Sequence, residues 1–154
     1  MTHPDSLKPI FISYSHKDRK LFQEFKKMLA PAIQKGIVDL WDDTKIEPGM
    51  KWQKEIETNL LSAKVAVLLV SPDFLASDFI SKNELPPLLK KANQGGTTIF
   101  WVYLSACLYE HTEIATYNAA HDLLKPLDQL SKANRQAIFS AVCKKLIDLA
   151  QNPK

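Results

Sequence analysis

The chain of 154 residues has no apolar run of about 18 residues, the length needed to cross a bilayer. Its four glycines exclude a collagen-like or glycine-rich chain. The first six residues lack a basic region followed by an apolar stretch, so we expect no signal peptide. The 45% share of apolar residues is too high for a wholly disordered chain. These properties indicate one compact globular domain.

The chain also has few cysteines and a small net charge. The two cysteines, Cys107 and Cys143, have no CxxC spacing, and we expect buried, reduced thiols in a cytoplasmic protein. Basic residues exceed acidic ones by only three, and the basic pairs fall inside helical patterns. A track for nucleic-acid phosphates needs clustered cations. We therefore expect neither nucleic acid nor membrane as a partner.

Strand-like and helix-like segments alternate along the chain. Apolar, β-branched runs predict strands at residues 9–14, 37–41, 65–70 and 97–104, with a short edge strand at 124–127, where proline is tolerated. Helical spacing predicts helices at residues 16–36, at 52–63, after Ser71, near 81–89 and at 132–150. Ser15–Asp18 has the spacing of a capping box at the start of the first helix, and Ser71 is the expected cap of the third. Gly36 and Gly95 are expected to end the first and the fourth segments. This order predicts an α/β fold of the flavodoxin-like type, a doubly wound parallel sheet of about five strands with helices on both faces.

Ligands of such sheets bind beyond the carboxyl ends of the strands. Ser13 and Tyr14 end the first predicted strand, Asp42 follows the second, and Ser71 follows the third. We therefore expect these polar side chains to gather at one rim.

Glu84 is the carboxylate that the sequence places near this rim. Proline belongs in the first turn of a helix, so Pro86 and Pro87 predict a helix start near Asn83, with Glu84 in the first turn. A carboxylate there could stabilise a developing cation. The alternative is a capping box from Ser81 to Glu84, in which the carboxylate satisfies a backbone N–H, and local sequence alone favours this alternative.

Other chemistries lack their motifs. No phosphate-binding glycine loop, metal-ligand histidine spacing or GxSxG nucleophile motif occurs. We expect Trp41, Phe74 and Trp101 to lie in the core. Trp52 and Phe79 are also expected to be core residues, with ligand contact as the alternative because they flank the predicted rim.

Three motifs, in this order, resemble those of a TIR domain. They are Phe11–Ser15 (FISYS), Trp41–Asp43 with the loop to Trp52, and Leu69–Pro72 with the later Glu84. The resemblance spans residues 8–149. The segment 79–89 is similar to that of bacterial anti-phage TIR domains fused to STING-like or SAVED cyclic-nucleotide sensors.

The resemblance implies one of two functions. Enzymatic TIR domains cleave the nicotinamide–ribose bond of NAD+, their substrate rather than a resident cofactor, with a glutamate that Glu84 matches. Other members are scaffolds that act through TIR–TIR association. A receiver-like domain is disfavoured, because its acidic positions hold Ser13–Ser15 and Ser71 here.

The resemblance also implies a binding site. Ser13, Tyr14 and Asp42 would line its nicotinamide-riboside end, Lys45 would lie near the pyrophosphate or an assembly contact, and Phe79 would stack on a ring. Many members carry tryptophan four residues before the glutamate, where this chain has Ile80.

Assembly is the expected switch. Self-association would use the second-strand loop, Asp42–Lys51, called the BB loop in the family. We expect residues 1–8 to be an extension, residues 9–150 the TIR domain, and residues 151–154 a polar tail leading to a sensor domain.

Overall fold

The computed structural model describes residues 9–42, 62–78 and 80–151. Five parallel strands form one sheet in the order β2-β1-β3-β4-β5. They are β1 (Pro9–Ser13), β2 (Asp39–Trp41), β3 (Val65–Val70), β4 (Thr98–Tyr103) and β5 (Asn118–Ala119). The predicted doubly wound sheet is confirmed.

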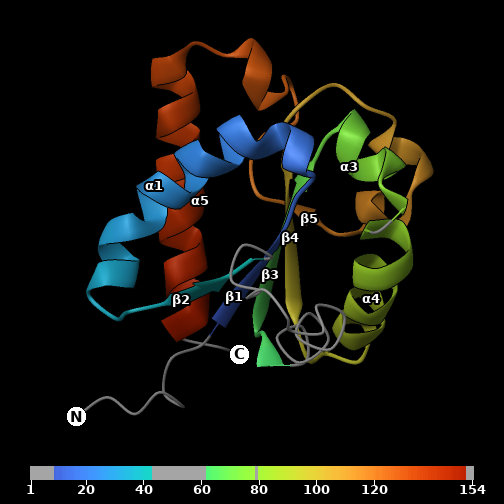
Figure 1. The fold of residues 1–154 in the computed structure, drawn as a ribbon, viewed down its shortest axis with the longest axis horizontal. Coiled ribbons are helices and arrows are strands. Elements are labelled where there is room, and N and C mark those ends of the chain that lie inside the picture. Colours follow the sequence, from blue (N-terminus) through green and yellow to red (C-terminus); the bar gives the residue numbers. More distant parts are fainter. Residues whose placement is uncertain (1–8, 43–61, 79, 152–154) are drawn as a thin grey trace, which may run out of the picture.

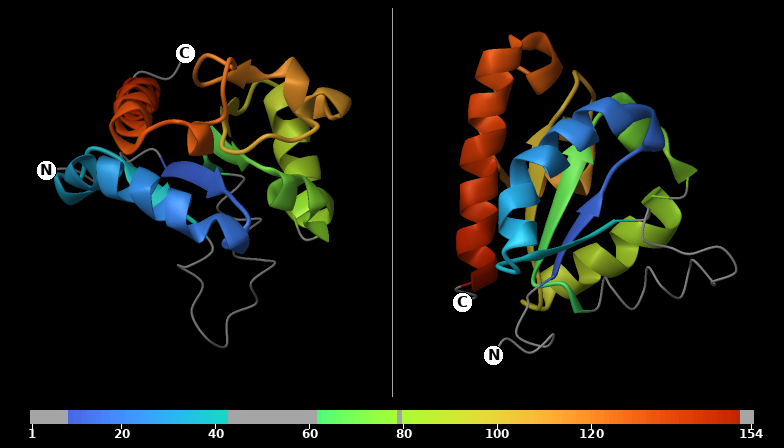
Figure 2. Two further views of the ribbon diagram at one scale, coloured as in Figure 1. Left: turned by 90° about the horizontal axis from the view of Figure 1, so that it is seen from above. Right: turned by 60° about the vertical axis from the view of Figure 1, so that its left-hand side comes forward.

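Helices cover both faces of this sheet (Figures 1 and 2). One face carries α1 (Arg19–Gln34) and α5 (Lys132–Gln151). The other carries α3 (Pro72–Ala76) and α4 (Leu85–Asn93). A 3₁₀ turn, η2 (His16–Asp18), precedes α1, and a π-helical turn, η4 (Ile80–Glu84), precedes α4. The predicted helix at 52–63 lies outside the described residues except for its last two positions.

Strand β3 explains the two layers. All six of its residues are buried, and they alternate between two hydrophobic clusters. Val65, Val67 and Leu69 pack toward α1 and α5, while the intervening residues pack toward α3 and α4. A strand that is apolar on both faces must be covered on both, as its sequence predicts.

The helices α1 and α5 are joined by charge as well as by apolar contact. Arg135 donates from Nε and Nη2 to the two carboxylate oxygens of Glu24, both at 3.0 Å. The rings of Phe25 and Phe139 meet edge to face at 5.7 Å between centroids. The bidentate pair of Arg135 and Glu24 restricts the relative position of the two helices more than apolar packing alone would.

Tight turns end two helical segments at glycines. Gly36 and Gly95 have φ angles of +71° and +78°, a left-handed conformation that glycine adopts without a steric penalty. The sequence predicted both helix ends from these residues.

The predicted edge strand at 124–127 is wrong. The fifth strand is Asn118–Ala119, which pairs with Phe100 and Trp101. Leu127 lies instead fully buried in a 3₁₀ turn, η7 (Leu127–Gln129), and the N–H of Asp128 donates to the carbonyl of Leu104. This segment therefore crosses the end of β4 rather than extending the sheet.

Core packing predicts a large difference between two leucines. Leu68 is fully buried in β3, whereas Leu108 is 70% exposed. We expect Leu68→Ala to lower the free energy of unfolding by about 2–5 kcal/mol, because it leaves a cavity. We expect Leu108→Ala to change it by less than about 0.5 kcal/mol. Urea denaturation of both variants would show equal losses if β3 were not the centre of the core.

Candidate functional site: Glu84 at the carboxyl rim of the sheet

The centre of the candidate site is a contact between Ser13 and Glu84, which lie 71 residues apart in sequence. The Ser13 hydroxyl donates a hydrogen bond to Oε1 of Glu84. Ser13 ends β1 on the face that also carries Phe11, the face covered by α3 and α4. The two residues are 1% and 5% exposed, respectively. A buried carboxylate is therefore held at the predicted rim.

Two prolines explain the backbone before α4. Pro86 and Pro87 have no N–H, so they cannot donate to the carbonyls of residues 82 and 83 as a continuous α-helix would require. The chain instead forms the π-helical turn η4, which ends at Glu84. Single π-turns of this kind occur often at functional sites.

The capping box predicted from Ser81 to Glu84 does not form. The Ser81 N–H donates to the carbonyl of Ser77, and the Ser81 hydroxyl donates to the carbonyl of Asp78. Glu84 directly precedes α4 and makes no side-chain capping bond to it. The Glu84 carboxylate instead accepts a hydrogen bond from Ser13, a residue far away in sequence, whereas the local pattern predicted a helix cap.

Tyr14 and Asp42 lie toward α1, on the face opposite to the Ser13 side chain. The Tyr14 ring stacks on Phe22 at 3.9 Å between centroids and an interplanar angle of 9°. Asp42 is fully buried, and Lys26 of α1 places its Nζ 3.6 Å from Oδ2 of Asp42. The structure therefore divides the predicted binding residues between the two faces of the sheet.

Two further predicted residues, Lys45 and Phe79, lie outside the described residues, as does the predicted assembly loop after Asp42. Their assignments stay predictions. The three aromatic residues expected in the core, Trp41, Phe74 and Trp101, are all buried.

A second serine–carboxylate pair, which sequence patterns do not predict, lies at the end of β3. The Ser71 hydroxyl donates to Oδ2 of Asp18 and accepts a 3.0 Å hydrogen bond from the N–H of Phe74. Ser71 thus caps α3, as predicted. The helix-start pattern at Ser15 predicted a local role for Asp18, but the partner is 53 residues away. Only the shared rim of parallel strands could have suggested the pair.

Burial also sets the ionisation of several side chains. It raises the pKa of Asp18, an effect that the Ser71 hydrogen bond opposes and that the charges of Asp73 and Asp128 reinforce. It raises the pKa of the buried Cys143 thiol to about 12, and it is the main cause of a raised pKa at the half-buried Cys107. Both thiols are therefore protonated at neutral pH.

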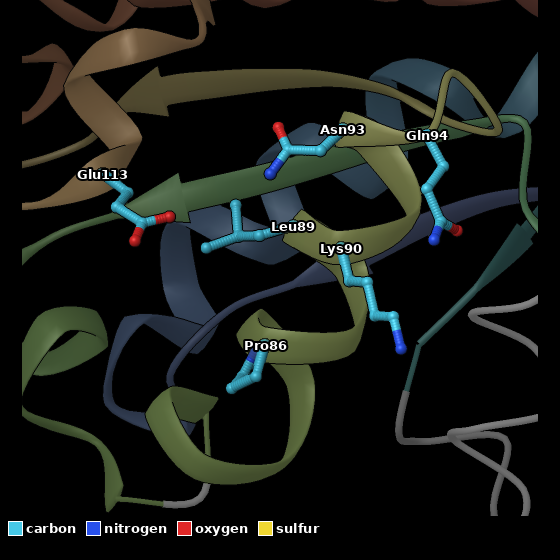
Figure 3. A pocket seen from close by; sticks show the side chains of 6 residues that line it. All are labelled: Pro86, Leu89, Lys90, Asn93, Gln94 and Glu113. Atoms are coloured by element: carbon cyan, nitrogen blue, oxygen red, sulfur yellow. The ribbon is translucent and has the colours of Figure 1, made fainter.

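An open groove of about 480 Å³ lies on the outer side of α4 (Figure 3). It is lined by Pro86, Leu89, Lys90, Asn93, Gln94 and Glu113. Glu84 is not among these residues, so the groove is separate from the buried carboxylate.

Within the described part of the chain, no three His, Cys, Asp or Glu side chains are placed to hold a metal ion. No helix there is long and apolar enough to cross a membrane.

The profile of the TIR domain family matches residues 10–138. The chain therefore belongs to the TIR domain family. A relative from Sinorhizobium fredii, the uncharacterized protein y4lF, is 29% identical over 120 residues, which are 78% of this chain and 37% of that protein. The chain thus spans little more than a third of this relative.

Two solved structures share the fold. The TIR domain of the Toll-related receptor TRR-2 from Hydra magnipapillata has a TM-score of 0.53 at 15% identity, covering 90% of this chain and 97% of its own. The second structure contains the TIR domains of the activated Roq1 resistosome, which directly recognises the pathogen effector XopQ. Its TM-score is 0.52 at 17% sequence identity, and the match covers 89% of this chain and 84% of that chain.

The raised pKa of Asp18 predicts a pH-dependent stability effect. The folded protein favours the protonated form of the Asp18 carboxyl, because burial raises its pKa. The contribution of Asp18 to the free energy of unfolding is therefore present at low pH and is lost as the pH rises through the pKa of the folded state. Asp18→Asn keeps an oxygen that can accept the Ser71 hydroxyl but cannot ionise. We expect this variant to gain stability relative to the wild type between about pH 4 and pH 7.

Urea denaturation across this pH range measures the gain, and the exposed Asp78→Asn is the matched control. A difference between Asp18→Asn and the wild type that stays flat or falls with rising pH would contradict the assignment.

Proposed function

We propose that this TIR domain is an NAD+ glycohydrolase that uses Glu84 to cleave the nicotinamide–ribose bond. The observation that carries the proposal is the carboxylate of Glu84 at the rim of the sheet, held by Ser13. Membership of a family that includes such enzymes supports it.

The chemistry needs one well-placed anion. The C1′–N bond of NAD+ breaks, its electron pair stays on nicotinamide, and nicotinamide leaves neutral without an added proton. The ribose left behind has oxocarbenium character, which a carboxylate stabilises as in glycoside hydrolysis. Water adds at C1′ and loses one proton, giving ADP-ribose. Capture by the adenine of the same molecule instead of water would give a cyclic product.

The remaining residues that the resemblance assigns to the site keep their proposed roles around Glu84. Ser13 lies beside the carboxylate, and Asp42 and Tyr14 would shape the nicotinamide-riboside end from the α1 side. Lys45 would meet the pyrophosphate, and Phe79 would stack on a ring. The free thiols of Cys107 and Cys143 support the proposed cytoplasmic location, where NAD+ is available.

Assembly is the proposed switch for this activity. Glu84 is only 5% exposed, so a substrate reaches it only after its surroundings rearrange. Self-association through Asp42–Lys51, driven by a fused cyclic-nucleotide sensor in anti-phage defence, would provide that rearrangement. The Roq1 TIR domains belong to an activated assembly, which supports this proposal.

A non-enzymatic scaffold is the second candidate, and the burial of Glu84 favours it. A TIR domain that only recruits other TIR domains has no need of an accessible carboxylate. Such a protein would assemble without releasing nicotinamide, so a verified assembly that leaves NAD+ intact would support the scaffold.

Replacing Glu84 tests the enzymatic proposal. The chain is first driven into assemblies by crowding or by a fused oligomerisation domain. In these assemblies, we expect Glu84→Gln to lower the rate of nicotinamide release at least about 100-fold. The amide keeps the shape of the side chain but removes the charge that stabilises the oxocarbenium ion. Release is measured by chromatography, and Glu113→Gln, an exposed glutamate beyond α4, is the matched control. Equal release by both variants would remove Glu84 from the mechanism.

The assembly proposal predicts a dependence on concentration. We expect the specific activity of the purified domain to rise with protein concentration and to be low where light scattering shows a monomer. Full specific activity in a monomeric solution would contradict activation by assembly.

A further inference from the structure

Ser13 is an unusual residue at the end of its strand. The three residues before it are apolar and buried, and Ser13 is itself only 1% exposed. A hydroxyl in such a place costs free energy unless it forms a hydrogen bond. Its partner is the carboxylate of Glu84, so each of these two buried polar groups satisfies the other.

The helix that follows Glu84 gives the carboxylate less support than most helix starts do. Pro86 and Pro87 occupy the first turn of α4, which therefore lacks two of the N–H groups that form the positive end of a helix dipole. A hydroxyl donor from β1 offsets part of this loss, because a hydrogen bond to the ionised form stabilises it.

We infer that Ser13 is a positioning residue for the proposed NAD+ cleavage, whose hydroxyl holds the Glu84 carboxylate in its orientation for the reaction. This inference rests on the proposed function. It assigns Ser13 an action on the carboxylate rather than on the substrate. A group held in place before the substrate arrives lowers the barrier of the chemical step without changing the binding of the substrate.

The pair of Ser71 and Asp18 is the natural comparison. It has the same chemistry, and it also lies at the carboxyl end of a strand. Ser71, however, accepts from the N–H of Phe74 and caps α3, so its role is structural. Loss of the Ser71 hydroxyl should therefore affect stability, and loss of the Ser13 hydroxyl should affect catalysis.

Two substitutions of equal size separate the hydroxyl from packing at position 13. Ser13→Thr keeps the hydroxyl, whereas Ser13→Val replaces it with a methyl group of similar shape. In the assembled chain, we expect kcat for nicotinamide release to be about 10- to 100-fold lower for Ser13→Val than for Ser13→Thr. We expect the KM for NAD+ to agree within about threefold, since the substrate contacts are unchanged.

Thermal unfolding of each variant checks the fold. If the added methyl group unfolds both variants, Ser13→Ala is compared with the wild type under the same expectation. Ser71→Ala is the matched control, and we expect it to lower the Tm while keeping kcat within about threefold of the wild type.

Equal kcat values for folded Ser13→Thr and Ser13→Val would overturn the inference. A rise in KM with unchanged kcat would also overturn it, because Ser13 would then contact the substrate. Either result leaves the proposed function intact as long as the wild type releases nicotinamide and Glu84→Gln does not. An assembled wild type that releases none would instead refute the proposed function.

Discussion

The uninterrupted burial of β3 is the constraint on which the rest of the molecule depends. A strand with six buried residues in alternating clusters needs cover on both faces and hydrogen-bonded neighbours at both edges. That requirement places β1 and β4 beside it and brings the carboxyl ends of all three strands to one rim. The polar residues at this rim then meet, although long stretches of sequence separate them.

The rim holds two serine–carboxylate pairs with different consequences. The pair of Ser71 and Asp18 closes the start of α3 and links it to the turn before α1. The pair of Ser13 and Glu84 joins β1 to a π-helical turn that precedes the two prolines of α4. One pair completes a helix cap, while the other holds a carboxylate that no cap requires. This difference is why the second pair is the candidate for chemistry.

Sequence patterns predicted most of the fold because its signals are local. Apolar runs located four strands, and Gly36 and Gly95 located two helix ends. The fifth strand was missed because Asn118 and Ala119 have no apolar alternation and are held by pairing with β4. The two serine–carboxylate pairs span 71 and 53 residues, so local spacing could not predict them. Ser15 and Ser71 form the caps that local spacing predicts, whereas Glu84 does not. Such partners become visible only once the sheet brings the strand ends together.

A structure of the assembled Glu84→Gln chain with NAD+ bound would test the proposed role of Glu84, since this variant should leave the substrate intact. We expect C1′ of the nicotinamide riboside to lie against the side chain at position 84, with the Ser13 hydroxyl still bonded to that side chain. NAD+ bound with its nicotinamide–ribose bond away from position 84 would contradict this role.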